Sequence, residues 1–381
     1  MQNDEPIPFN KPFLVGSELN NIADAVLVQN WISGNGTYTK RCTRWLEQHL
    51  GVPAALLTHS CTAALEMTAL LAELEPGDEV IMPSFTFPST ANAYVLRGAV
   101  PVFVDIRADT LNIDETQIEA AITPRTRAIV IVHYAGYPCE MDTIMAIARR
   151  HDLIVIEDAA QALLSTYRGQ QLGTFGTFSC LSFHETKNVI SGEGGALLIN
   201  DPKYIERAQI LHEKGTNRAA MMQGHVDKYT WVDVGSSFMP GEIIAAFLAA
   251  QLDHADTIIA RRQEIHERYR QRLLPLQDRV TLPLPCNEGN GHLFYILVAT
   301  AAERPRLISY LRERKITAVF HYVPLHSAPA GVKFGRFLGN GLPVTDDISS
   351  RLLRLPVYRS MTDSDIDRVV DAVANFYGQA T

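Results

Sequence analysis

Short apolar runs, most of them apolar throughout, alternate with amphipathic stretches over the first two-thirds of this chain. A run that is apolar at every position has both of its faces covered, as the strands of a parallel sheet do. The runs expected as strands are residues 54–58, 79–82, 100–105, 128–132 and 153–157. Residues 61–73 and 88–97 fit helices, and Met141, Ile144, Met145 and Ala148 follow the helical i, i+3, i+4, i+7 spacing. This order predicts βαβ units and an α/β fold with a mostly parallel central sheet.

The pattern changes after Lys187. One long helix is expected from near Gly241 to Pro275, which is long enough to bridge two domains. The other expected elements are a strand at 196–199, a helix at 202–214, a strand at 292–298, a helix at 304–314, a strand at 317–320 and a helix at 363–377. We therefore expect a large domain over residues 12–250 and a smaller C-terminal α/β domain over residues 251–381.

Charge and cysteine content argue against several kinds of protein. The 42 Asp and Glu residues outnumber the 34 Lys and Arg residues, whereas a nucleic-acid binder usually carries a basic excess. The five cysteines are scattered without a Cys-x-x-Cys pair, so we expect no disulfide framework, metal site or iron–sulfur cluster. No apolar run has the length of a membrane span, and residues 1–5 are polar and acidic, unlike a signal peptide. We expect a cytoplasmic protein without a nucleic-acid or membrane partner.

Three polar segments follow expected strands, and the carboxyl ends of parallel strands meet at one edge of a sheet, where ligands bind. The first is Thr58-His59-Ser60-Cys61-Thr62, which joins a strand to a helix. A helix N-terminus offers free N–H groups and a positive dipole end, and hydroxyls from Ser60 and Thr62 would add donors for a phosphate. A simple helix N-cap explains the same residues.

The second segment begins with Glu157 and Asp158, which close the apolar strand at 153–156. Either carboxylate could simply mark the end of the strand. Alternatively, one of them faces a cation in the cleft, such as a protonated pyridine nitrogen, whose charged form an adjacent carboxylate favours.

The third segment, residues 178–188, carries Lys187 between an apolar strand and the glycine-rich turn at 192–195. A partly desolvated lysine has a lowered pKa and can act as an amine nucleophile that forms a Schiff base. Together the three segments offer a phosphate cradle, a carboxylate for a pyridinium and a Schiff-base lysine, which are the groups that pyridoxal 5′-phosphate (PLP) needs. Phe87 would stack on the pyridine ring, although a core position explains a phenylalanine equally well.

The Glu157-Asp158-Ala159-Ala160-Gln161 segment and the 182–195 segment resemble those of the DegT/StrS-type sugar aminotransferases. The likeness extends over nearly the whole chain. Further matching segments are residues 7–12, 60–63, 83–87, 133–136, 213–218, 227–231 and 321–326. The resemblance implies an aspartate-aminotransferase-like fold (PLP fold type I) and a homodimer whose active sites lie at the subunit interface.

The resemblance also implies a role for each residue of the matching motifs. Lys187 would hold PLP, Asp158 would pair with the pyridine nitrogen, and Gln161 would lie near the ring oxygen. The remaining expected cofactor contacts are Phe87 on the ring face, Ser60, Cys61, Thr62 and Ser182 at the phosphate, and Ser237 from the partner subunit. His321, Tyr322 and His326 would border the sugar pocket, with aromatic packing at a strand end as the alternative. No arginine stands out for the donor carboxylate.

The activity implied by the resemblance is transfer of an amino group from L-glutamate to C4 of a TDP-linked 4-keto-6-deoxy-D-glucose. The galacto (axial) product is expected, and the gluco epimer or another nucleotide ketosugar is the alternative. Three other classes compete. A dehydratase on this scaffold would replace Lys187 with histidine, a non-catalytic regulator would have a degenerate site, and a nicotinamide oxidoreductase would need a dinucleotide fingerprint that this chain lacks.

Overall fold

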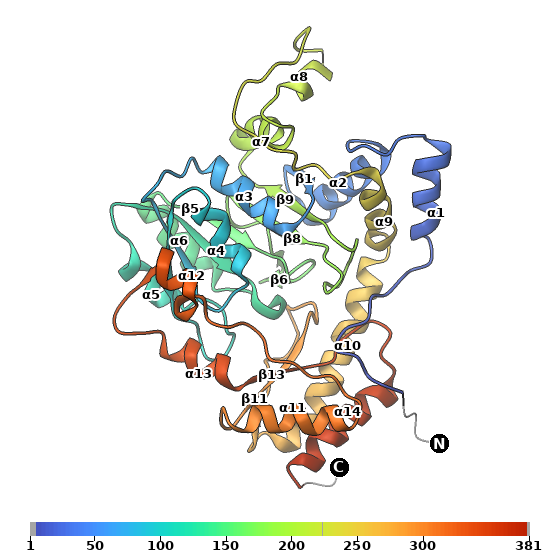
Figure 1. The fold of residues 1–381 in the computed structure, drawn as a ribbon, viewed down its shortest axis with the longest axis vertical. Coiled ribbons are helices and arrows are strands. Elements are labelled where there is room, and N and C mark those ends of the chain that lie inside the picture. The colour runs from blue at the N-terminus through green and yellow to red at the C-terminus, as the bar shows by residue number, and fades with distance from the viewer. Residues whose placement is uncertain (1–4, 223, 379–381) are drawn as a thin grey trace.

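The computed structural model describes residues 5–222 and 224–378, so residues 1–4 of the polar, acidic start lie outside the described residues. Its centre is an eight-stranded sheet in the order β1-β9-β8-β5-β4-β2-β3-β12 (Figure 1). The strands are β1 (Ala54–Thr58), β2 (Glu79–Pro83), β3 (Val100–Val104), β4 (Thr126–Val132), β5 (Ile154–Asp158), β8 (Phe178–Ser182), β9 (Gly195–Ile199) and β12 (Arg336–Phe337). Only β9 runs antiparallel to its neighbours in this sheet. The predicted α/β fold with a mostly parallel sheet is confirmed.

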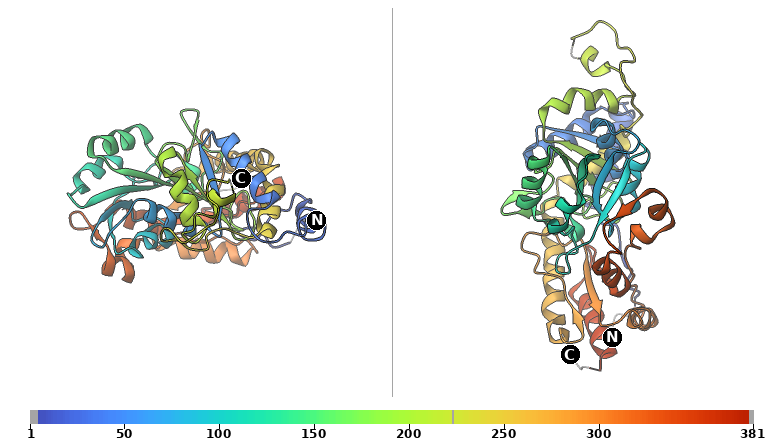
Figure 2. Two further views of the ribbon diagram at one scale, coloured as in Figure 1. Left: turned by 90° about the horizontal axis from the view of Figure 1, so that it is seen from above. Right: turned by 90° about the vertical axis from the view of Figure 1, so that its left-hand side faces the viewer.

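Helices cover both faces of the sheet (Figure 2). Side chains of successive strand residues point to opposite sides, so each strand packs on both layers. In β2, for example, Ile81 packs into one hydrophobic cluster while Val80 and Met82 pack into the other. The helices on the Ile81 side are α2 (Thr37–Leu50), α5 (Glu115–Ala121), α6 (Met141–His151) and α9 (Glu242–Leu252). Those on the other side are α3 (Cys61–Leu71), α4 (Pro88–Val95) and α7 (Ile205–His212). This double covering explains why the central parts of these strands are mostly apolar.

The single helix predicted from Gly241 to Pro275 is wrong, because the chain bends by 61° between α9 and α10 (Ala255–Leu273). α9 is apolar on all sides and packs in the large core, whereas the buried side of α10 packs in a separate cluster with the C-terminal strands. The two helices therefore follow two different packing surfaces. Among the described residues, no single helix has both the length and the apolar composition of a membrane span. One pair of helices, Glu242–Leu252 and Ala255–Leu276, has both only when the two bent segments are taken as one.

The C-terminal part of the chain builds a three-stranded antiparallel sheet of β10 (Val280–Thr281), β11 (Phe294–Val298) and β13 (Leu352–Leu355). α10, α11 (Glu303–Glu313) and α14 (Asp363–Phe376) pack on it. The strand predicted at 317–320 is wrong, because that segment makes only a single β-bridge, between Val319 and Arg354. The strand β13, which carries Arg354, was not predicted. The predicted division between residues 250 and 251 falls near the end of α9 and stays a prediction.

The remaining elements are short. They are α1 (Glu18–Ala23), a π-helical segment (Asp24–Val28), α8 (Arg218–Met222), α12 (Pro329–Phe334), α13 (Pro343–Arg351) and the hairpin of β6 (Thr166–Tyr167) and β7 (Gln170–Gln171). Single 3-10 turns lie at Tyr134–Gly136, Pro202–Tyr204, Leu274–Leu276 and Leu325–Ser327. The segment that carries α8 projects from the end of the molecule opposite the C-terminal sheet (Figures 1 and 2).

Candidate active site

A cavity of about 650 Å³ lies at the carboxyl ends of the parallel strands, between the large sheet and residues of the C-terminal sheet. It brings together ten of the twelve predicted site residues: Ser60, Cys61, Thr62, Phe87, Asp158, Gln161, Ser182, Lys187, His321 and Tyr322. Ser237 and His326 do not line it. The residues converge because the strand ends and the N-termini of α3 and α4 meet at this edge.

The start of α3 leaves backbone donors free toward the cavity. Ser60 is the N-cap, and its hydroxyl accepts a hydrogen bond from the Ala63 N–H at 3.1 Å. Within the described part of the chain, the N–H groups of Cys61 and Thr62 have no partner, as expected at a helix N-terminus. Gly195 of β9 lies against this turn, where a Cβ would stand 2.4 Å from the Cys61 nitrogen. The cap and the phosphate cradle are therefore compatible interpretations of the same turn.

Asp158 ends β5 and is buried beside the cavity. Its carboxylate accepts hydrogen bonds from the Thr90 hydroxyl at 2.7 Å and from the Ala160 N–H at 3.2 Å. Of the residues that the structure describes, no cationic side chain forms an ion pair with it. Burial raises the pKa of Asp158, and the two hydrogen bonds only partly oppose that rise. A cationic ring nitrogen in the cavity would supply the missing charge partner.

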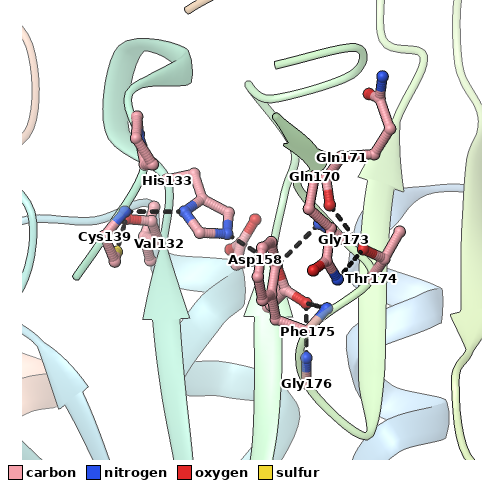
Figure 3. A network of polar contacts seen from close by, with 12 residues as sticks. Val132, His133, Cys139, Asp158, Gln170, Gln171, Gly173, Thr174, Phe175 and Gly176 are labelled. Carbon is pink, nitrogen blue, oxygen red and sulfur yellow. Dashed lines mark hydrogen bonds and ion pairs between the residues drawn. The ribbon is translucent and has the colours of Figure 1, made fainter. Parts of the chain in front are cut away.

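Glu157 has a different environment, because neighbouring strand residues point to opposite faces of the sheet. Its carboxylate accepts hydrogen bonds from the N–H groups of Gly173, Phe175 and Gly176 at 2.7–2.8 Å and from His133 Nε2 at 2.9 Å. Figure 3 shows these four donors, with His133 on one side and the three backbone donors on the other. His133 Nδ1 accepts from the backbone at Cys139, so the ring proton lies on Nε2. Glu157 is therefore a structural acceptor, and Asp158 is the carboxylate that faces the cavity.

Lys187 lies in the turn after β8, half-buried in the cavity wall. The turn is closed by backbone hydrogen bonds from Glu185 to Gly192 and from Phe183 to Gly194. Gly192 and Gly194 have φ values of 84° and 150°, which explains the glycines. Burial lowers the pKa of Lys187, so its amine gives up its proton more readily than an exposed lysine.

Phe87 and Gln161 complete the part of the cavity formed by the large sheet. Phe87 leaves 59% of its surface exposed, which is unusual for a phenylalanine and leaves its ring free to cover a planar ligand. Gln161 is fixed on both sides: its amide donates to the Tyr322 hydroxyl at 2.7 Å, and its oxygen accepts from the Ala135 N–H at 2.7 Å. Ser182 ends β8 at the cavity wall.

The C-terminal part of the chain contributes His321, Tyr322 and Arg354. His321 stacks on Tyr322 with ring centroids 3.7 Å apart, and its Nδ1 lies 2.6 Å from the Tyr134 hydroxyl. Arg354 was not predicted, because nothing in the sequence around it distinguishes it from a surface arginine.

The structure places the last two predicted residues elsewhere. His326 is buried against Ser84, with Nδ1 2.8 Å from the hydroxyl, and lies 3.4 Å from Asp346. It therefore holds the 324–327 turn against the end of β2 instead of lining the cavity. Ser237 is exposed and forms a bridge with Glu213. Its predicted contact is with a partner subunit and stays a prediction.

The donor set fits PLP. The free N–H groups at the start of α3 suit a phosphate, the unpaired buried Asp158 suits a protonated ring nitrogen, the exposed Phe87 suits a ring face, and Lys187 suits an aldehyde. A mostly parallel α/β sheet with this set at its carboxyl edge defines an aminotransferase of PLP fold type I.

Comparison with known proteins identifies the family. The chain belongs to the DegT/DnrJ/EryC1/StrS aminotransferase family, which it matches over residues 14–374. It is 34% identical over 379 residues to the spore coat polysaccharide biosynthesis protein SpsC of Bacillus subtilis, with 96% of each chain covered.

Solved structures agree. The aminotransferase TlmJ of Streptoalloteichus hindustanus superposes with a TM-score of 0.89 at 30% identity, covering 98% of this chain and 99% of TlmJ. The PLP form of Spr1654 of Streptococcus pneumoniae, described as a sugar aminotransferase, superposes with a TM-score of 0.88 at 28% identity, covering 96% of this chain and 97% of that chain. The predicted fold class and the resemblance to the family are confirmed.

Proposed function

We propose that this sugar aminotransferase transfers the amino group of L-glutamate to C4 of TDP-4-keto-6-deoxy-D-glucose, giving TDP-4-amino-4,6-dideoxy-D-galactose and 2-oxoglutarate. The observation that carries the proposal is the arrangement of Lys187, Asp158 and the α3 N-terminus around one cavity. The substrate rests on the likeness of the whole set of motifs to the TDP-4-amino-4,6-dideoxygalactose transaminase of enterobacterial common antigen synthesis. PLP is the cofactor.

Each residue then has a task that its position allows. Bound PLP supplies an aldehyde for the amine and a cationic ring that delocalises negative charge. Lys187 would hold it through Nζ and, once released, would take the proton from the α-carbon of the donor, because its pKa is lowered by burial. Asp158 would keep the ring nitrogen protonated. Phe87 would cover the ring face, and the Cys61 and Thr62 N–H groups would bind the phosphate.

The experiment is incubation of the purified protein with L-glutamate and TDP-, UDP- or GDP-linked 4-ketosugars, followed by NMR of the product. The proposal predicts a new amine at C4 of the TDP sugar, with the small C4 proton couplings of the galacto product. Large couplings would establish the gluco epimer instead. The Lys187→Ala variant is the control and should form no product.

A non-catalytic regulator is the alternative from another class. The presence of Lys187, Asp158 and Gln161 in one cavity favours an enzyme, because a regulator has no need of a base beside a buried acid. A protein that binds PLP and forms no amine from any ketosugar would refute the proposed reaction and support the regulator.

We also propose that the protein is a homodimer. Leu27 and Val28 expose 79% and 76% of their surfaces in a segment that packs beside α9, and Trp231 exposes 78% in the segment after α8. Large apolar side chains this exposed are typical of interaction surfaces. The same segment carries Ser237, so a partner could bring it to the second active site. Sedimentation equilibrium should give twice the chain mass, and a monomer would contradict this proposal.

A further inference from the structure

The first turn of α4 reaches Asp158 through one buried side chain. Pro88 begins this helix, and Thr90 follows two residues later with no exposed surface. The Thr90 hydroxyl donates to Asp158 Oδ2 at 2.7 Å. In the part of the chain that the structure describes, no other side chain forms a hydrogen bond with this carboxylate, and its second donor is the backbone N–H of Ala160 at 3.2 Å. The orientation of the Asp158 carboxylate therefore depends on Thr90.

A second buried threonine fixes the direction of this hydrogen bond. The hydroxyls of Thr86 and Thr90 lie 2.8 Å apart, and Thr86 exposes only 1% of its surface. An ionised carboxylate can only accept, so Thr90 gives its single proton to Asp158. The proton between the two threonines then comes from Thr86. The result is a chain of two donors, from Thr86 to Thr90 to Asp158, that ends on the carboxylate.

This chain of donors favours the charged form of Asp158. A hydrogen bond to an ionised acceptor is about twice as strong as one between neutral groups. Burial raises the pKa of Asp158, and the hydrogen bond from Thr90 acts against that rise. Thr90 therefore offsets part of the cost of keeping a buried charge at the place where a cationic ring nitrogen would bind.

The same turn of α4 also contacts the other groups expected around the cofactor. Phe87 is the N-cap residue of α4 and lines the cavity. Ser89 accepts a hydrogen bond at 2.7 Å from the hydroxyl of Thr62, in the first turn of α3. Residues 87, 89 and 90 thus connect the expected contacts of the ring face, the phosphate and the ring nitrogen through one helix start.

We infer that Thr90 is a positioning residue for the cofactor, which holds the Asp158 carboxylate charged and oriented for the ring nitrogen of PLP. The inference rests on the proposed role of Asp158 and not on the identity of the sugar substrate. Thr86 supports Thr90 from behind, because its proton leaves the Thr90 hydroxyl free to donate to the carboxylate.

The test compares PLP with its carbocyclic analogue, in which a carbon atom replaces the ring nitrogen, by calorimetric titration of the cofactor-free protein. Both ligands carry the aldehyde and the phosphate, so the ratio of their dissociation constants isolates the ring nitrogen. The wild type should prefer PLP. Thr90→Val should reduce this preference by about 10-fold, because it removes a hydrogen bond to a charged group. Thr90→Ser restores the hydroxyl and should restore the preference.

Two control variants make the result specific. Thr345 is as buried as Thr90 and donates to Asp105 Oδ1 at 2.7 Å, but neither residue lines the cavity. Thr345→Val therefore breaks a matched hydrogen bond elsewhere and should leave the preference within about twofold of the wild type. Ser89→Ala removes the neighbouring hydroxyl of the same turn and should change both dissociation constants by the same factor.

Two further variants test the route through the carboxylate. Asp158→Asn should reduce the preference for PLP, and Thr90→Val added to it should cause no further reduction, because Thr90 acts through the charge of Asp158. Thr86→Val keeps the Thr90 hydroxyl and should reduce the preference by about two- to threefold, because it removes only the second donor of the chain. If Thr90→Val does not fold, Thr86→Val decides the question.

A preference in Thr90→Val within about twofold of the wild type, together with a reduced preference in Asp158→Asn, would overturn the inference alone. Equal reductions in Thr90→Val and Thr345→Val would also overturn it, because the effect would then be one of general stability. An unchanged preference in Asp158→Asn would overturn the inference together with the proposed role of Asp158. The sugar product measured by NMR is independent of all three outcomes.

Discussion

Replacement of Asp158 by asparagine should have opposite effects on the cofactor-free protein and on the working enzyme. Without PLP, the Asp158 carboxylate is buried with two hydrogen bonds and no ion pair, and burial raises its pKa. Asparagine has the same shape and no charge, and the Thr90 hydroxyl can accept from its amide while donating its own proton to the Thr86 hydroxyl 2.8 Å away. The variant should therefore be more stable than the wild type by about 1–3 kcal/mol at neutral pH.

The sign of the pH dependence follows from the raised pKa. Below the ordinary pKa of an aspartate, the Asp158 carboxyl group is neutral in both the folded and the unfolded wild type, and the free energy of unfolding is at its highest with respect to this group. That free energy falls as pH rises through the higher pKa of the folded state, because a charge must then be buried. The stability difference between variant and wild type should therefore be largest at neutral pH and disappear below about pH 4, where both side chains are neutral. Urea unfolding of the cofactor-free proteins at several pH values measures this difference.

The loaded enzyme should respond in the other direction. A carboxylate beside a cation shifts the pKa of that cation by about 1–3 units, each worth about 1.4 kcal/mol. Loss of the Asp158 charge should therefore lower turnover about 10- to 1000-fold. Transamination assays with both proteins at saturating PLP give the ratio. Turnover within about twofold of the wild type, or a less stable cofactor-free variant, would refute the reasoning.

Three other predictions test separate parts of the structure. Lys187→Ala should abolish transamination while changing the free energy of unfolding by less than about 1 kcal/mol, because the side chain is only half-buried; residual turnover near the wild-type level would contradict its role. Glu157→Gln should cost about 2–4 kcal/mol in urea unfolding, because four donors lose a charged acceptor, and a cost below about 0.5 kcal/mol would refute this. Burial, with the charge of Arg270, lowers the pKa of His266 to about 4. The unfolded chain therefore takes up this proton at a higher pH than the folded protein, and the free energy of unfolding of the wild type should fall by up to about 3 kcal/mol as pH falls from 6.5 to 4. His266→Gln should lack this loss, and an unchanged pH profile would contradict it.

The sequence predicted the large sheet well because its signal is local. The strands are mostly apolar, with their polar residues largely at the strand ends, and the loops at the carboxyl edge that carry the site are polar or glycine-rich. The turns that carry Lys187 and Ser60 could be located for the same reason. The residue pattern alone did not decide between Glu157 and Asp158, because both follow the same apolar run, and the family resemblance was needed to single out Asp158. In the structure the pleat of β5 separates their environments.

The missed features depend on contacts between distant segments. Helical periodicity continues through residues 253–254, and only the two packing surfaces of α9 and α10 require the bend. β13 has four residues and follows α13 directly, so it has no turn signal of its own. Arg354 is placed in the cavity by Phe320 and Phe9, which no pattern around Leu352–Leu355 reveals.

The most direct measurement is to reduce the purified protein with borohydride in the presence of PLP, digest it, and sequence the peptide that retains the pyridoxyl group. We expect the label on Lys187, because that amine is half-buried in the wall of the cavity that Asp158 also lines. A label on any other lysine, or none despite added PLP, would contradict the account.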